Sequence, residues 1–192
     1  EMEVLSPLIG AHNYSNVVAA VAAADFMGIP IEQSIEAVKD FKGIKRRMEL
    51  RGEVGGVKVF DDFAHHPTAI QATIIAAKRQ FIGNKYLTKS KNQTRIVVVF
   101  EPRSNSMKIG SMKDKLSKSF TEADQVFIFA EGLKWDIKNT FSTLVPQPKI
   151  HNNLDALINE IISYTIPGDV VLIMSNGGFG GIHKKILAKL SD

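Results

Sequence analysis

The chain has 192 residues, of which 44% are hydrophobic and 23% charged, a composition typical of a globular protein. It has no cysteine, which excludes disulfides, thiolate metal sites and a cysteine nucleophile, and which fits a cytoplasmic protein. The net charge of +4 is too small to indicate nucleic-acid binding, and no apolar run approaches the roughly 18 residues of a membrane span, so we expect neither nucleic acid nor membrane as a partner.

The first part of the chain is expected to be helical. We expect Asn13 or Ser15 to cap a first helix that runs to Met27. Gly28 would end this helix, and Pro30 follows just beyond. A second helix is predicted over residues 31–41, because apolar residues recur there at about the 3.6-residue period of a helix. The basic segment Lys45-Arg46-Arg47 follows, and we interpret it as the boundary between a domain of residues 1–45 and one of residues 46–192.

The rest of the chain alternates between segments typical of strands and segments typical of helices. Gly55-Gly56 predicts a hairpin, and continuous apolar runs predict buried parallel strands. Strands are predicted at residues 49–54, 57–60, 96–100, 126–130 and 170–174, and helices from Pro67 onward and at residues 112–120, 154–164 and 182–190. This order predicts an α/β fold with a Rossmann-like, mostly parallel sheet flanked by helices. The lysine-rich segment 83–94 is predicted to be a mobile loop.

Ligands of such sheets bind beyond the carboxyl ends of the strands. The loops that follow predicted strands are residues 61–66, 101–110, 131–136 and 175–181, and three of them are rich in polar residues and glycine. These loops are therefore the candidate ligand-binding segments.

The segment Asp61-Asp62-Phe63-Ala64-His65-His66-Pro67 leaves a strand and enters a helix. Its carboxylates and imidazoles suit a metal, a ribose or an ammonium group, and the alternative is that Asp62 or His66 caps the helix. Adjacent histidine side chains diverge, so we expect no metal site at this segment.

Two further segments suit anions. Arg103 offers the fork that binds a carboxylate or phosphate, and Ser104, Asn105 and Ser106 add small donors, although a surface turn would have the same composition. Ser175-Asn176-Gly177-Gly178-Phe179-Gly180-Gly181 opens a helix, and its four glycines allow close approach of a ligand to the backbone. The alternative is a tight structural turn, because neither G-x-G-x-x-G nor a phosphate loop is matched.

Together these segments resemble the Mur ligase family over nearly the whole chain and in the family's order. Gly10-Ala11-His12-Asn13-Tyr14-Ser15-Asn16 resembles the G-x-H-N-x-x-N stretch that ends the central ATP-binding domain, and the basic segment resembles the start of the last domain. The segment that begins at Asp61 resembles the D-D-[YF]-[GA]-H-H-P form of the muramate branch. The resemblance implies that residues 1–45 are a helical remnant of the central ATPase domain and residues 46–192 the C-terminal, acceptor-binding domain.

The resemblance also implies an activity. Residues 101–108 and 174–183 are similar to those of the branch that uses ATP and Mg²⁺ to join the acidic tripeptide L-Ala-γ-D-Glu-meso-diaminopimelate to UDP-N-acetylmuramate in peptidoglycan recycling. The runner-up acceptor is L-alanine, and a non-catalytic Rossmann-like module that binds a nucleotide or sugar phosphate is a different class. Because no G-x-x-x-x-G-K-[ST] loop is present, we expect this chain alone not to hydrolyse ATP, with Mg²⁺ and most of the ATP held by other domains.

Individual roles follow from the same resemblance. His12, Asn13 and Asn16 would face adenine, Asp62 the ribose hydroxyls and Arg47 the terminal phosphate, with Arg47 and His65 as the catalytic candidates. The acceptor candidates are Phe63, His65, Arg103, Ser104, Asn105, Ser106, Ser175, Asn176, Gly177 and Gly178. Many family members carry a lysine where this chain has Ala64, so the resemblance does not extend to that phosphate contact.

Overall fold

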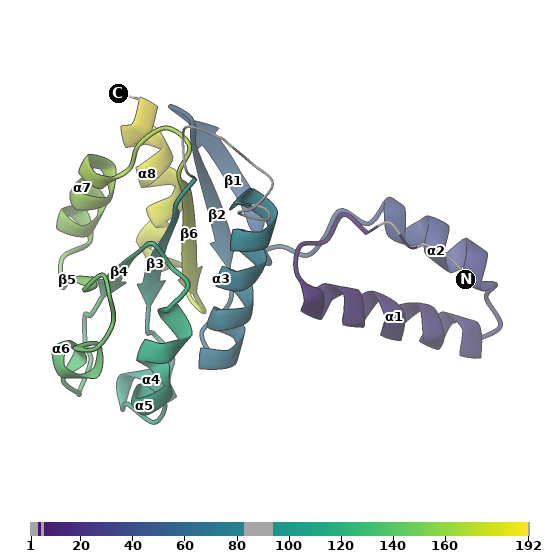
Figure 1. Ribbon diagram of the computed structural model, residues 1–192, viewed down its shortest axis with the longest axis horizontal. Coiled ribbons are helices and arrows are strands. Elements are labelled where there is room, and N and C mark those ends of the chain that lie inside the picture. The colour runs from purple at the N-terminus through teal and green to yellow at the C-terminus, as the bar shows by residue number, and fades with distance from the viewer. Residues whose placement is uncertain (1–3, 5, 83–93, 192) are drawn as a thin grey trace. The chain divides into compact units, whose positions relative to one another are not determined.

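The computed structural model describes residues 4, 6–82 and 94–191, which form two compact units, Glu1–Lys45 and Arg46–Asp192 (Figure 1). The division falls within the basic segment. Apart from Thr94, the predicted mobile loop lies outside the described residues.

The first unit contains two helices, α1 (Ala11–Phe26) and α2 (Ile31–Lys39). The predicted cap at Asn13 or Ser15 is wrong, because α1 begins earlier, after Gly10, whose φ of 102° is accessible to glycine. The Asn13 amide instead donates to the carbonyl of Ile9 at 2.7 Å. The second helix is two residues shorter than predicted.

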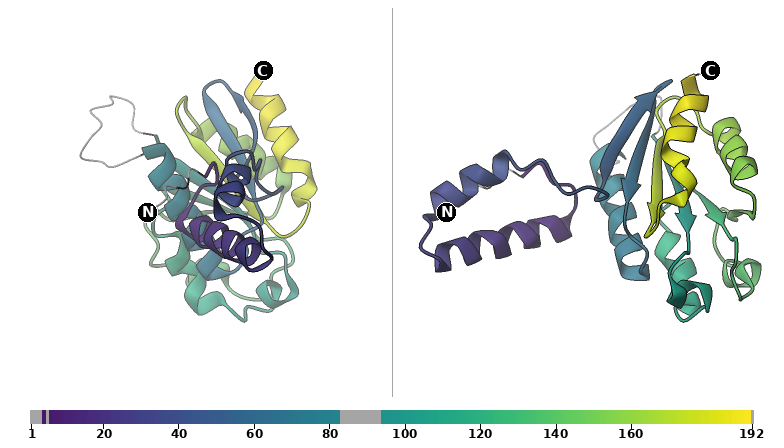
Figure 2. Two further views of the ribbon diagram at one scale, coloured as in Figure 1. Left: turned by 90° about the vertical axis from the view of Figure 1, so that its right-hand side faces the viewer. Right: turned by 180° about the vertical axis from the view of Figure 1, so that it is seen from behind.

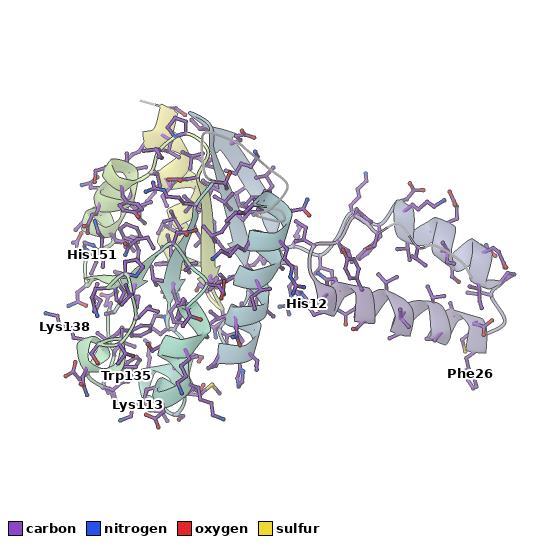
Figure 3. The ribbon with its side chains drawn as sticks, viewed as in Figure 1. His12, Phe26, Lys113, Trp135, Lys138 and His151 are labelled. Atoms are coloured by element: carbon purple, nitrogen blue, oxygen red, sulfur yellow. The ribbon has the colours of Figure 1, made fainter. Side chains whose placement is uncertain are left out.

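Apolar side chains of the first unit are largely exposed. The helices bury only Val17 and Ile35, whereas Phe26 is 89% exposed at the end of α1 (Figure 3). Two helices of this length cannot enclose a core between them. The first unit therefore adds little hydrophobic core of its own.

The second unit is built on a six-stranded sheet with the order β1-β2-β6-β3-β4-β5. The strands are β1 (Glu49–Val54), β2 (Val57–Asp62), β3 (Ile96–Glu101), β4 (Gln125–Phe129), β5 (Lys149–His151) and β6 (Val170–Ser175). Only β1 and β2 pair antiparallel, through a turn in which Gly55 and Gly56 have φ of 57° and 76°. The predicted α/β class with a mostly parallel sheet is confirmed.

Helices cover both faces of this sheet (Figure 2). The longer ones are α3 (Pro67–Ile82), α7 (Leu154–Tyr164) and α8 (Ile182–Ser191). Short turns complete the unit: α4 (Asn105–Lys108), α5 (Lys113–Leu116), α6 (Ile137–Thr140) and the 3-10 turns η1 (Ser117–Phe120) and η2 (Phe179–Gly181). The single helix predicted over residues 112–120 is therefore two pieces, and the Ser119 hydroxyl, which donates to the Leu116 carbonyl, competes with regular helix bonding there.

The core consists of two clusters, one on each face of the sheet. Val98 and Phe100 of β3 pack with α3 and η1, whereas Val97 and Val99 face α7 and α8. Both central strands, β3 and β6, are buried on both faces, which explains their unbroken apolar sequences. Within the described part of the chain, no helix has the length and apolar character to cross a membrane.

One buried ion pair joins the starts of β3 and β6. Arg95 donates to both carboxylate oxygens of Asp169, at 2.9 and 2.6 Å, and the Asp169 side chain is 1% exposed. This hydrogen bonding raises the pKa of Arg95 above its usual value. The pair lies at the amino ends of the strands, away from the candidate loops.

We expect Arg95→Ala to lower the free energy of unfolding by about 3 kcal/mol, because it leaves a buried carboxylate unpaired. Urea denaturation of the chain measures this loss. Adding Asp169→Asn to Arg95→Ala should recover part of it, since the unpaired charge is then removed. A double variant no more stable than Arg95→Ala would contradict this explanation.

Candidate functional site

Three of the candidate loops meet at the carboxyl edge of the sheet. Parallel pairing sets Asp62 opposite Met174 and Glu101 opposite Ser175, so β6 lies between β2 and β3 with their ends aligned. The loops that begin at Asp61, Glu101 and Ser175 are therefore neighbours, although they come from distant parts of the sequence.

The glycine loop, residues 175–178, is held by its own serine. The Ser175 hydroxyl donates to Glu101 Oε2 at 2.5 Å and accepts from the Gly177 amide at 2.9 Å. Ser175 is only 2% exposed. Its hydroxyl is committed mainly to shaping the loop.

Arg103 lies directly over this loop. A Cβ atom added to Gly177 would meet Arg103 Cδ at 2.3 Å and Nε at 2.5 Å, so glycine is what lets the arginine approach the backbone. The guanidinium is 3.8 Å from Glu101 Oε1, and 54% of the side chain is exposed. Arg103 thus places a partly exposed guanidinium group at the carboxyl ends of the strands, where it could bind an anion.

The polar residues after Arg103 have partly structural roles. Ser104 caps α4 by accepting from the Met107 amide at 3.3 Å, and its hydroxyl lies 3.1 Å from that of Ser106. Asn105 begins α4 and is exposed. The segment is therefore a short capped helix beside Arg103 rather than an irregular surface turn.

Asn176 carries an unpaired buried atom. Among the described residues, no hydrogen-bond partner reaches its Oδ1, which is inaccessible to solvent. A buried carbonyl oxygen without a donor is unfavourable. Asn176 is thus the member of the glycine loop with spare hydrogen-bonding capacity.

Asp62 is buried and bonded to the backbone. Its two oxygens accept from the amides of Ala64 and Met48, each at 2.8 Å, so it does not cap α3. Burial raises the pKa of Asp62, and this outweighs the opposite effects of those hydrogen bonds and of Arg47. Its predicted contact with ribose would have to use the remaining lone pairs.

Asp61 is also buried but is surrounded by cations. Its Oδ1 lies 3.3 Å from His183 Nε2 and 3.6 Å from Arg46 Nε. Burial alone would raise its pKa, but the contact with His183 and the charges of Arg46 and Arg51 together hold the pKa below the usual value. Asp61 Oδ1 and His183 Nε2 are both buried, and His183 is the polar side chain that lies closest to this oxygen.

The turn after β2 fixes Phe63 and His65. His65 Nδ1 lies 3.0 Å from the Phe63 carbonyl oxygen, and the two rings meet edge to face. Arg46 and Arg47 both approach the Phe63 ring, with guanidinium carbons 5.1 and 5.7 Å from its centroid. His66 bonds instead to Thr68 and is part of the helix start.

In the first unit, the three adenine candidates lie in the first turns of α1. His12 (labelled in Figure 3) and Asn16 are exposed and four residues apart, which puts them on one helix face. Asn13 is partly committed, since its amide donates to Ile9 and its Oδ1 accepts from Asn16.

The sequence interpretation missed Arg46, Asp61 and His183 as members of this site. Asp61 and His183 stood inside segments that had been singled out, but neither residue was given a role. Arg46 belongs to the segment interpreted as a boundary, and no pattern in the sequence shows that its side chain reaches the glycine loop.

Gly177→Ala is expected to displace the Arg103 guanidinium while changing the free energy of unfolding by less than about 1 kcal/mol, because only the end of a flexible side chain must move. The Arg103 Nε–H signal in an NMR spectrum of the chain reports that displacement. Gly178→Ala is the matched control, since its added Cβ has no neighbour within 4 Å. Equal Arg103 signals in both variants would contradict the close contact.

Comparison with known proteins places these features in a family. The Mur ligase, glutamate ligase domain matches residues 46–177. UDP-N-acetylmuramate–L-alanyl-gamma-D-glutamyl-meso-2,6-diaminoheptandioate ligase of Haemophilus influenzae is 42% identical over 98% of this chain and 40% of its own length. UDP-N-acetylmuramate–L-alanine ligase of Pelotomaculum thermopropionicum is 33% identical over 95% of this chain and 40% of its own length.

A solved structure agrees. The murein peptide ligase of Psychrobacter arcticus has 38% identity and a TM-score of 0.72, over 98% of this chain and 39% of that one. This chain thus spans about 40% of the length of the curated relatives that it matches. The sequence segments, the fold and the matched domain agree, and the chain belongs to the Mur ligase family.

Proposed function

We propose that this chain is the C-terminal part of an ATP-dependent ligase that joins L-alanyl-γ-D-glutamyl-meso-diaminopimelate to UDP-N-acetylmuramate in peptidoglycan recycling. Similarity supports this acceptor, because identity is 42% to a ligase named for it and 33% to one named for L-alanine. The observation that carries the proposal is Arg103, a forked and half-exposed cation above Gly177. Such a group suits an acceptor with several carboxylates, as the acidic peptide has, and the methyl side chain of alanine offers it nothing to bind.

Amide formation sets three requirements for the protein. The acceptor amine must attack a carboxyl carbon that carries a good leaving group, so that a C–N bond forms, phosphate departs and the amine loses a proton. ATP bound with Mg²⁺ would supply the activation of the muramyl carboxyl group. The residues of this chain would orient the acceptor, accept the proton and stabilise phosphate charge.

His65 has the tautomer needed to accept a proton. A carbonyl oxygen only accepts hydrogen bonds, so the contact with the Phe63 carbonyl at 3.0 Å puts the proton of the neutral ring on Nδ1. Nε2 is then the basic nitrogen, which supports His65 as the acceptor of the amine proton. Arg47 comes from the segment before β1, its guanidinium carbon lies 5.7 Å from the centroid of the Phe63 ring, and we assign it to the phosphate charge.

The nucleotide contacts rest on chemical fit. The exposed pair His12 and Asn16 offers two polar groups on one helix face to adenine, next to Asn13. Asp62 would accept from ribose hydroxyls with its free lone pairs. Across residues 4, 6–82 and 94–191, no three histidine, aspartate or glutamate side chains are grouped as a metal site, so Mg²⁺ would be held mainly by phosphates and by groups elsewhere.

The acceptor can be tested in the complete ligase that contains this chain. We expect kcat/KM for the tripeptide to exceed that for free L-alanine by at least about a hundredfold, because alanine has one carboxylate, next to its amine, and lacks the additional carboxylates farther along the peptide that Arg103 would bind. Release of phosphate with each acceptor at saturating UDP-N-acetylmuramate and ATP measures this ratio. A preference for L-alanine would identify the runner-up activity instead.

Arg103→Ala in the complete ligase is expected to raise the KM for the tripeptide by about tenfold or more, the order expected for loss of a charge-assisted hydrogen bond. The KM for ATP should not change, and Arg103→Lys should lie between, because it keeps the charge but not the fork. Arg79→Ala, at an exposed position near the end of α3, is the control. Unchanged kcat/KM in Arg103→Ala would remove Arg103 from the acceptor site.

A further inference from the structure

Arg46, the first residue of the second unit, has an unusual backbone. Its φ is 60°, in the left-handed region that residues other than glycine adopt rarely. The conformation is held from both sides, because the Arg46 amide donates to Glu49 Oε2 at 2.8 Å and its carbonyl accepts from the Phe63 amide at 2.8 Å. These two hydrogen bonds fix the backbone of Arg46, and the fixed backbone limits the directions that its side chain can take.

That side chain reaches the glycine loop. Arg46 Nη2 donates to the carbonyls of Ser175 and Gly177, at 2.5 and 2.8 Å, across 129 and 131 positions of sequence. The guanidinium also packs over the Phe63 ring, and its Nε is 3.6 Å from Asp61. The Arg46 clamp, defined as Arg46 with these two carbonyls and Asp61, joins the start of the domain to the loop.

The clamp lies directly behind the proposed acceptor site. Its two carbonyls flank Asn176, whose side-chain oxygen lacks a partner among the described residues, and one belongs to Gly177, over which Arg103 lies. Asp61 is itself braced by His183 from the first turn of α8. Loss of the guanidinium would free both carbonyls and leave the backbone under Arg103 without its support.

We propose that Arg46 is a positioning residue for the acceptor, which acts by fixing the backbone of residues 175–177 so that Asn176 and Arg103 face the peptide. This inference rests on the proposed function only in taking the glycine loop as the acceptor site. Arg46 differs in this from Arg47, which is assigned to the phosphate and which, within the described part of the chain, makes no hydrogen bond to the loop.

Kinetics of the complete ligase test the role. Arg46→Met keeps the length and packing of the side chain but not its donors, and we expect it to raise the KM for the acceptor by about tenfold, as for loss of a charge-assisted hydrogen bond. The KM for ATP should stay within about twofold of the parent value, and Arg46→Lys should recover part of the loss, because one ammonium can still reach a carbonyl. The matched control is Arg79→Met, which removes an exposed arginine near the end of α3. A rise in the KM for ATP without a rise for the acceptor would overturn the proposal.

Hydrogen exchange in the 192-residue chain separates positioning from direct contact. We expect Arg46→Met to speed exchange of the Gly177 amide hydrogen. That amide donates to Ser175 Oγ, and the loop around it would lose the two hydrogen bonds from Arg46. Arg79→Met should leave that rate unchanged. A higher acceptor KM with unaltered exchange would mean that Arg46 touches the acceptor itself, and the positioning role would fall.

The test of Arg46 can be made with whichever acceptor the complete ligase prefers. If the complete ligase prefers L-alanine, the proposed function fails, and the same KM comparison with L-alanine still tests Arg46. If the tripeptide is preferred and Arg46→Met leaves its KM unchanged, the inference fails and the proposed function stands.

Discussion

The pairing of β6 between β2 and β3 is the constraint on which the site depends. β6 is the last strand of the chain, yet it hydrogen-bonds in parallel to both earlier strands over nearly its whole length. Because side chains alternate between the faces of a strand, a shift of one residue in this register would turn every core side chain of β6 away from its cluster. The apolar burial of the sheet therefore fixes which residues of the three loops come together, and the polar edge takes its geometry from the core.

The adjacent carboxylates of Asp61 and Asp62 show how this constraint divides the chemistry. Consecutive residues of a strand point to opposite faces, so Asp61 meets Arg46 and His183 of α8, whereas Asp62 meets Thr73 of α3. Their pKa values consequently shift in opposite directions. Ionised Asp61 stabilises the fold above its unfolded pKa and loses this effect as the pH falls through its lowered folded pKa, while burial makes ionised Asp62 unfavourable. Two adjacent carboxylates in one motif thus have separate partners on opposite faces of the sheet.

Sequence patterns predicted the parts of the fold that long or distinctive segments encode. The Gly55-Gly56 turn, the helix from Pro67 and the apolar strands follow directly from turn chemistry and periodicity. β5, α4 and α6 were missed because three or four residues show no measurable period. The convergence of the candidate loops followed from the rule for parallel sheets. The role of Arg46 did not, because its positive φ and its contacts more than a hundred residues away leave no trace in local composition.

The positive charge near Phe63 comes from outside the turn that follows β2. Ala64 is 1% exposed and packs in the core cluster with α3, so this position of the turn belongs to the hydrophobic core and supplies no charge. The cations beside this turn are Arg46 and Arg47, which come from the segment before β1 and both approach the Phe63 ring. Two adjacent arginines repel each other, and the neighbouring Asp61 and Asp62 offset that repulsion. The Phe63 ring and the carboxyl groups of Asp61 and Asp62 therefore allow two adjacent guanidinium groups to lie close together. Of these two groups, that of Arg46 bonds to the glycine loop.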